Sequence, residues 1–293
     1  MSDTIKLAAF AAASALVWVV ANCKETVEIH NVEEFLAWNI STEGRDTIDD
    51  DVYLMDDLDF SSVPKVNVRY VGHMPSSTQR VFTGTFYGNN HSIRNLVLLN
   101  HGTAKFRRDA GLFKEVSGTV RDLFIDSSCH FEGYYAASVA IYSTGATYEN
   151  VHSAATLKGK SVGGLFAWIN QESTNTVKNC SFSGTIIVER GNELRHRQGG
   201  GLAGYAIKGT VDVDSFVFAG VIHGISSSGY DTHLGGLIGE EDKNSVCTVT
   251  NSLNRGHMFG TSIQGNIYAG AVIGQQIRGK SSTTNVTNEG TLM

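Results

Sequence analysis

The sequence predicts an all-β protein folded as a right-handed parallel β-solenoid (a parallel β-helix) of about seven coils, with a short N-terminal capping helix. Two observations lead to this fold class. A Gly-hydrophobic motif recurs along most of the chain, and an Asn or Asp follows each copy. The composition agrees, because 32 Gly and only 2 Pro suit a backbone that turns tightly and often.

The motif is a Gly followed by two apolar residues and then by a small residue. Its copies begin at Gly111, Ser138, Gly164, Gly201, Gly236 and Ala271, at spacings of 27, 26, 37, 35 and 35 residues. Such a period suits one solenoid coil. The repeat glycines are expected at corners where a Cβ atom would clash; they are Gly111, Gly164, Gly201, Gly204, Gly236, Gly239 and Gly274. Two adjacent apolar residues cannot both point inward from an ideal strand, so either the strand bends or its outer face is covered.

The polar residue after each motif forms a second column along the chain. Its members are Asn95, Asp122, Asn150, Asn179, Asp214, Asn251 and Asn285. Asn and Asp tolerate the left-handed backbone of a bend, and stacked Asn amides can hydrogen-bond along a ladder. The column is therefore predicted to be a structural ladder, and its members are not catalytic candidates.

This pattern resembles the GLUG motif, a Gly-Leu-hydrophobic-Gly repeat of bacterial and protist surface or adhesin-like proteins. Residues 201–204 and 236–239 match the motif in full, and segment 82–96 is similar to what precedes such repeats. The resemblance covers roughly residues 31 to 290, with departures at the Ser138 copy and after Phe113. A family defined by its repeat implies an architecture and a surface location rather than a reaction.

The chain divides into three predicted segments. Residues 1–21 are typical of a signal peptide, because their apolar stretch suits an h-region and is too short to cross a bilayer. Lipidation at Cys23 is an alternative export route. Residues 22–60 are expected to form an N-terminal cap, a helix plus the first strand, and residues 61–293 the solenoid with GLUG-like repeats.

The two ends of the solenoid differ in sequence. Asn31 is the expected N-cap of a helix, and Glu34 completes a capping box. The apolar face of this helix would cover the first coil, whose edge is otherwise exposed. No such device follows the last rung, so this end is expected either to self-associate with another subunit or to be covered by the final strand.

Composition excludes several partners. The formal net charge of −6 gives no basic footprint, so no nucleic acid partner is expected. No apolar run beyond the N-terminus approaches the roughly 18 residues that span a bilayer, so no transmembrane span is expected. The four cysteines are expected to be isolated, buried thiols rather than a disulfide framework.

Several groups of residues have a chemical interpretation and a structural one. The Asp-rich segment 46–59 could bind Ca²⁺, but it lacks the EF-hand order, and turn-forming Asp residues explain it. His196 lies in an Arg-His-Arg run, which could contact an anionic glycan, and His233 lies beside Asp231 as a base beside its orienting group would. Solvated loops explain both. One Thr per coil is too few for an ice-binding face.

Catalysis is not indicated. The ladder residues Asp122 and Asp214 are three coils apart, too far for the paired carboxylates of a polysaccharide lyase or hydrolase. No nucleophile elbow, metal triad or phosphate loop is found. The sequence therefore predicts a protein that is not an enzyme and that has no catalytic residue, no metal ligand and no cofactor.

The predicted function is that of a secreted or cell-surface protein, structural or adhesive, whose solenoid face binds a protein or glycan partner or its own copies. Two alternatives stay open: a carbohydrate-active β-helix enzyme, and a subunit of an extracellular filament. Asn39 and Asn90 lie in sequons and are acceptors for N-glycosylation if the source is eukaryotic. The sequons at Asn179 and Asn285 are predicted to stay unmodified because both residues belong to the ladder.

Overall fold

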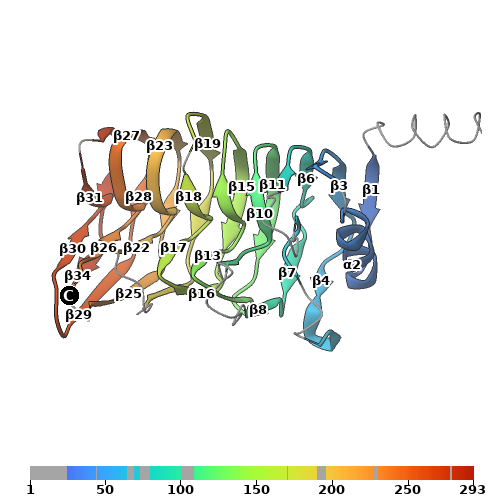
Figure 1. Ribbon diagram of the computed structural model, residues 1–293, viewed down its shortest axis with the longest axis horizontal. Coiled ribbons are helices and arrows are strands. Elements are labelled where there is room, and N and C mark those ends of the chain that lie inside the picture. Colours follow the sequence, from blue (N-terminus) through green and yellow to red (C-terminus); the bar gives the residue numbers. More distant parts are fainter. Residues whose placement is uncertain are drawn as a thin grey trace, which may run out of the picture.

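The protein winds as a parallel β-solenoid whose coils stack side by side from helix α2 to the C-terminal strands (Figure 1). The computed structural model describes residues 25–43, 45–64, 69–72, 80–99, 109–169, 171–189, 196–226, 230–277 and 279–293. Pairing between the described strands is parallel, as in β11 with β15 and β22 with β26. The predicted signal peptide and Cys23 lie outside the described residues.

The strands of the described residues form three sheets that run along the solenoid. The largest contains β1 (Thr26–Ile29), β2 (Thr47–Ile48), β3 (Asp51–Leu54), β4 (Leu58–Asp59), β5 (Val81–Phe82), β6 (Thr85–Tyr87), β7 (Ser92–Arg94), β10 (Phe113–Val116), β11 (Thr119–Ile125), β14 (Ala140–Ser143), β15 (Thr147–Ser153), β18 (Phe166–Ile169), β19 (Thr174–Lys178), β20 (Ser181–Phe182), β23 (Ala203–Asp214), β24 (Val217–Phe218), β27 (Ile238–Thr250), β28 (Leu253–Asn254), β31 (Ile273–Gln276), β32 (Lys280–Thr284) and β33 (Thr287–Asn288).

The second sheet contains β8 (Val97–Leu99), β12 (His130–Glu132), β16 (Thr156–Gly159), β21 (Thr185–Val188), β25 (Val221–Ser226), β29 (His257–Ser262) and β34 (Thr291–Leu292). The third contains β9 (Asp109–Ala110), β13 (Tyr135–Ala137), β17 (Ser161–Gly163), β22 (Arg197–Gly200), β26 (Thr232–Gly235) and β30 (Ile267–Gly270). Strands β2, β3 and β4 already pair with the next coil, so stacking begins within the segment expected as the cap.

Helix α2 (Val32–Ser41) covers the N-terminal end of the solenoid. Its N-cap Asn31 accepts a hydrogen bond from the Glu34 amide (2.9 Å), and the Glu34 carboxylate accepts from the His30 amide (2.7 Å). The buried rings of Phe35 and Trp38 point into the solenoid; Phe35 meets Phe60 of the short 3-10 turn η1 (Phe60–Ser62) edge to face. The helix therefore removes apolar surface of the first coils from water.

The strand bends at each Gly-hydrophobic motif, and this bend lets both apolar residues face the core. Leu202 and Ala203 are both fully buried in the main hydrophobic core. The corner also brings successive coils into close backbone contact: a Cβ atom on Gly201 would lie 2.2 Å from the Gly236 carbonyl oxygen. Ser138, which replaces the motif glycine in one coil, donates its hydroxyl proton to the carbonyl of Gly164. Glycine is thus required wherever the next coil stacks this closely.

The ladder residues make hydrogen bonds from coil to coil. Asn150 donates from Nδ2 to Asp122 Oδ1 (2.8 Å), and Asn179 donates to Asn150 Oδ1 (2.6 Å). In the later coils, Asn251 donates to Asp214 (2.8 Å) and Asn285 to Asn251 (2.8 Å). Each series begins at an Asp, because an ionised carboxylate accepts protons but donates none.

Two details of the ladder differ from the sequence expectation. Asp59, which the repeat alignment missed, accepts from Asn95 Nδ2 (2.8 Å) and opens the ladder one coil earlier. At Asn150 and Asn179 the ladder residue itself has the left-handed backbone conformation, with φ values of 53° and 50°. In the coil of β23, however, this conformation is at Ser215 (φ 62°) and not at the ladder residue Asp214. The pairing of β19 with β23 aligns Asp214 with Lys178, so Ser215 takes the position equivalent to Asn179 and the carboxylate comes from the residue before the bend.

Candidate functional site

A column of side chains lies on the outer side of the motif corners, where the third sheet meets the largest sheet. In each coil, one such residue lies three positions before the first residue of the motif, and another lies four positions after it. Both positions are in register between successive coils. The pairs, one per coil, are Tyr135 and Tyr142, Ser161 and Trp168, Gln198 and Tyr205, His233 and Glu240, and Tyr268 and Gln275. We call these ten residues the corner column. It follows the solenoid axis across five coils.

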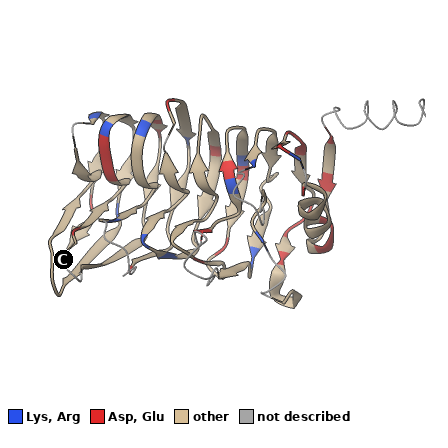
Figure 2. Ribbon diagram, in the orientation of Figure 1, with Lys and Arg blue, Asp and Glu red and all other residues tan. Residues whose placement is uncertain are grey.

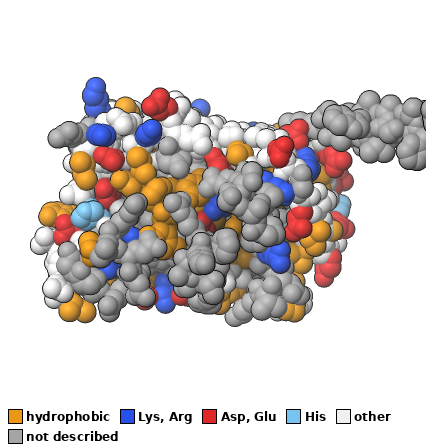
Figure 3. All heavy atoms as spheres, viewed as in Figure 1, with side chains coloured by type: hydrophobic (Ala, Val, Ile, Leu, Met, Phe, Trp, Pro, Cys, Tyr) orange, Lys and Arg blue, Asp and Glu red, His pale blue; other side chains and the backbone are white. Residues whose placement is uncertain are grey.

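The N-terminal half of the corner column is aromatic. Tyr135 and Tyr142 are buried in a hydrophobic cluster separate from the main core, and Trp168 packs against that cluster while half-buried. The Trp168 ring centroid lies 4.6 Å from that of Tyr135 and 5.1 Å from that of Tyr205. Its indole Nε1 donates to Ser161 Oγ (2.9 Å). Figure 3 shows hydrophobic side chains gathered in the middle of this face.

Two lysines are held against this aromatic half. Lys114 Nζ lies 5.0 Å from the centroid of the Tyr142 ring and forms an ion pair with Asp109. Lys160 Nζ donates to the Tyr134 hydroxyl (2.8 Å). Such cation–π and hydrogen-bond contacts fix the ammonium groups beside the rings. The column therefore combines ring faces with positioned proton donors.

The C-terminal half of the corner column is polar. Glu240 Oε2 accepts from Gln198 Nε2 (2.8 Å) and lies 2.7 Å from His233 Nδ1. The His196 ring stacks on His233 with centroids 5.1 Å apart, and the Tyr268 ring lies 5.4 Å from His233. This half is thus a network of imidazole, carboxylate and amide groups.

The solvated-loop interpretation is wrong for His233 and for Arg197, whereas His196 itself is exposed. His233 lies in β26 and is fully buried, with its ring against Glu240 rather than exposed on a loop. Arg197, in the expected charge run beside His196, is 1% exposed. Spacing along one strand does not reveal Glu240 as the partner, because it follows the motif corner in the next strand.

An open surface groove of about 590 Å³ lies on the outer side of β7, β11, β15 and β20. Its lining includes Arg94, Phe124, His152 and Ser181. His152 Nδ1 lies 2.8 Å from Ser181 Oγ, and the Phe124 ring stacks on the imidazole. Burial lowers the pKa of His152, which favours a neutral imidazole able to accept a proton.

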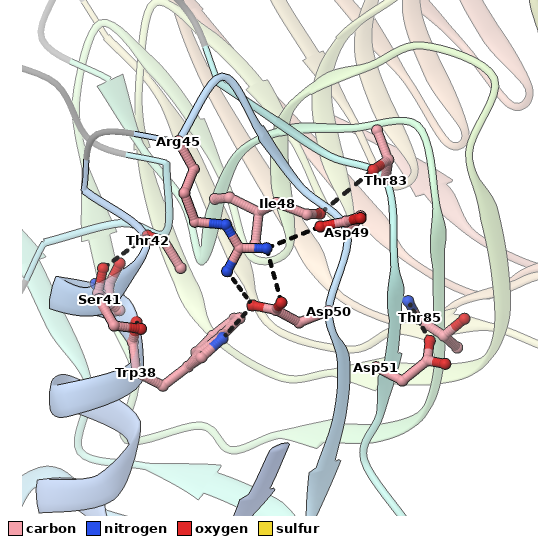
Figure 4. Close-up of polar contacts among 11 residues, drawn as sticks. Trp38, Ser41, Thr42, Arg45, Ile48, Asp49, Asp50, Asp51, Thr83 and Thr85 are labelled. Atoms are coloured by element: carbon pink, nitrogen blue, oxygen red, sulfur yellow. Dashed lines mark hydrogen bonds and ion pairs between the residues drawn. The ribbon is translucent and has the colours of Figure 1, made fainter. Parts of the chain in front are cut away.

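The Asp-rich segment mainly forms hydrogen bonds within the N-terminal coils. Arg45 contacts Asp49 (2.8 Å) and binds both oxygens of Asp50 (2.7 and 2.8 Å), and Trp38 Nε1 donates to Asp50 Oδ2 (2.9 Å; Figure 4). Asp57 accepts from the Ser92 amide (2.8 Å). Because these carboxylates bind Arg, Trp and backbone donors, the segment fits the structural interpretation better than a calcium site.

The two expected glycosylation acceptors differ in accessibility. Asn90 is exposed. Asn39 is 9% exposed, and its Nδ2 donates to the Arg69 carbonyl (2.9 Å). Asn39 is therefore not an accessible acceptor in the folded protein, since a glycan on Nδ2 would have to replace this hydrogen bond.

Neither a cluster of charged residues nor an apolar helix indicates a further functional site in the described part of the chain. Figure 2 shows acidic residues along β1 and α2 and charged residues scattered elsewhere. Within the described part of the chain, no helix is both long and apolar enough to cross a bilayer. Among the described residues, aromatic, imidazole and carboxylate side chains gather in the corner column and the open groove.

Comparison with known proteins supports the fold. No family model matches the chain, and no curated protein matches it. Among solved structures, it is similar to a crystal structure described as that of a putative immunoglobulin A1 protease from Bacteroides ovatus, with a TM-score of 0.58 and 14% sequence identity. The match covers 89% of this chain and 77% of the other. At this identity the likeness shows a shared parallel β-helix fold.

Proposed function

We propose that the protein is an exported, non-catalytic binding protein of the cell surface or extracellular space, and that its corner column binds a glycan. One observation carries this proposal: the half-buried rings of Trp168 and Tyr205 occupy the same register position in successive coils, next to the buried Tyr142. Parallel strands repeat about every 4.8 Å, which is close to the length of one sugar ring. A rigid scaffold that repeats aromatic groups at this interval suits an extended chain of sugars.

The chemistry around the rings fits the same ligand. The apolar faces of pyranose rings pack on aromatic side chains, and Trp and Tyr add a polar edge to a large apolar surface. Lys114 and Lys160 provide ammonium groups next to the rings. These donors would suit hydroxyl or carboxylate groups of a glycan, and the GLUG resemblance is in keeping with a surface location.

Tryptophan fluorescence tests this proposal. Titration with neutral and acidic oligosaccharides should change the emission of the wild-type protein saturably, and a glycan array should identify the class that binds. Trp168→Ala should abolish binding on the array, because it removes the half-buried ring at the centre of the column. Tyr53→Ala is the matched control, since Tyr53 stacks on Tyr87 outside the column (4.3 Å). Equal glycan binding by both variants would count against the corner column.

A serine hydrolase is the second candidate, favoured by the His152–Ser181 pair in the open groove. In such an enzyme the imidazole accepts the hydroxyl proton while the serine oxygen attacks an acyl carbon. The structural neighbour carries the name of a protease. A fluorophosphonate probe that labels the wild type but not Ser181→Ala would favour this alternative over the non-catalytic proposal.

Self-association through the C-terminal end is a separate proposal. The described side chains of β32, β33 and β34 are exposed, and these strands form the last coil of the structure. Their backbone edges could pair with another subunit. Sedimentation velocity at increasing protein concentration should then show oligomers, whereas a monomer at high concentration would contradict this proposal.

A further inference from the structure

Three residues with metal-binding side chains meet at the polar, C-terminal half of the corner column. His196 immediately precedes β22, Asp231 immediately precedes β26, and His233 lies within β26. One donor atom from each residue lies within 4.8 Å of the other two. The three residues therefore come from two successive coils that pair in parallel.

The hydrogen bonds of His233 leave one ring nitrogen available. Gln198 Nε2 is a donor, so Glu240 Oε2 acts as its acceptor, and the same oxygen then accepts the Nδ1 proton of His233. Nε2 consequently carries the lone pair. It is buried and has no hydrogen-bond partner among the described residues. A buried ring nitrogen without a partner is rare and calls for a ligand.

The other two residues are placed to complete a site. Asp231 Oδ1 accepts from the Asn266 amide (3.0 Å), which fixes the carboxylate and leaves Oδ2 directed toward His196 Nδ1 (3.9 Å). The His196 side chain is 49% exposed. It can therefore rotate, whereas His233 and Asp231 are held in place by Glu240 and the Asn266 amide.

We propose that His196, Asp231 and His233 bind a divalent transition-metal ion, with Zn²⁺ as the preferred ion. Two imidazoles and one carboxylate suit zinc, which accepts nitrogen and oxygen ligands at about 2.0–2.2 Å, whereas calcium prefers oxygen alone. The Glu240–His233 contact provides the carboxylate–histidine arrangement that orients metal-binding imidazoles. Donor atoms now up to 4.8 Å apart would close to roughly 3.5 Å around the ion, mainly by rotation of His196.

The ion would join two coils. His196 belongs to the coil of β22, whereas Asp231 and His233 belong to the coil of β26. The ion would thus hold the two coils together at the polar end of the column. This proposal does not depend on glycan binding, because none of its three ligands belongs to the aromatic half.

Calorimetric titration of the untagged, metal-free protein with Zn²⁺ tests the proposal, with Ca²⁺ in a parallel titration. We expect about one Zn²⁺ per chain, no saturable Ca²⁺ binding, and at least about tenfold weaker Zn²⁺ binding in His196→Ala and Asp231→Asn. His223→Ala is the matched control, because this exposed histidine stacks on Phe259 in the second sheet. It should bind Zn²⁺ like the wild type.

A spectroscopic measurement distinguishes lost ligands from lost fold. Co²⁺ should give the intense visible absorption of a four-coordinate site in the wild type and in His223→Ala, but not in His196→Ala. Circular dichroism should show the same β content in all variants, since His196 is half-exposed and immediately precedes β22 rather than belonging to it. Absence of saturable Zn²⁺ binding to the wild type would overturn the proposal, as would equal binding by His196→Ala and Asp231→Asn.

Discussion

Replacement of Gly201 by Ala tests whether close stacking of the motif corners holds the coils together. The added Cβ atom would lie 2.2 Å from the Gly236 carbonyl oxygen and 2.6 Å from Phe218 Cδ2. The carbonyl belongs to the backbone of the next coil and cannot rotate away without disturbing the corner. Forced overpacking costs about 1–3 kcal/mol, and a backbone obstacle places the expected loss near the upper end, at about 3 kcal/mol.

Gly111→Ala is the matched control at the same motif position. The nearest atoms to its added Cβ would be Ile141 Cγ1 at 3.1 Å and the Ala137 carbonyl oxygen at 3.3 Å. Neither glycine has the positive φ that would itself penalise a side chain. Lower entropy of the unfolded chain offsets a small strain, so this variant should stay within about 0.5 kcal/mol of the wild type.

Urea unfolding followed by circular dichroism measures the difference, and hydrogen exchange locates it. The Gly201→Ala midpoint should fall well below those of the wild type and Gly111→Ala, with faster exchange in β23 and β27. Solenoid coils can open locally, so the exchange data guard against a transition that involves only part of the chain. Equal midpoints for the two variants would refute the view that the carbonyl contact is what requires glycine.

Three further predictions concern the ladder and the cysteines. Asn150→Ala should lower the free energy of unfolding by about 2–3 kcal/mol, because Ala is strained at a φ of 53° and two ladder hydrogen bonds are lost; Asn150→Gly should cost less, and equal midpoints in urea would contradict this reasoning. Hydrogen bonds from Asn251 and Thr250 hold the pKa of Asp214 below its usual range, and the Asn95 hydrogen bond does the same to the pKa of Asp59. Their contribution to stability is therefore complete above the unfolded-state pKa of about 4 and lost as the pH falls through the lower folded-state values, so urea midpoints should decline below about pH 4 and decline less in Asp214→Asn. Burial raises the pKa of Cys129 to about 11 and of Cys180 to about 12, and it also raises the pKa of Cys247; in a Cys23→Ser variant, a thiolate-selective reagent should label these three thiols only after unfolding, and rapid labelling of the native protein would be the contrary result.

The sequence alone determined the coil, its corners and the ladder. This was achievable because each depends on a local rule that repeats: Gly where the backbone of the next coil comes within contact, and Asn where the chain turns through a left-handed bend. Asn150 and Asn179 could be aligned without knowledge of any neighbour. Ser215 could not, because the sequence pattern aligns Asp214 with Asn179, whereas the strand pairing aligns Asp214 with Lys178 and leaves Ser215 at the bend.

The tertiary structure decided which outer side chains meet. The offset of seven residues across each motif, as between Tyr135 and Tyr142 or His233 and Glu240, was present in the sequence as a regular spacing. This spacing alone does not show that the two side chains touch. They touch because the bend angle at the motif corner brings the strands before and after it close together. The burial of His233, its bond to Glu240 and its approach to His196 depend on that angle and on the register between successive coils. These are properties of packing between distant segments, which a local pattern does not specify.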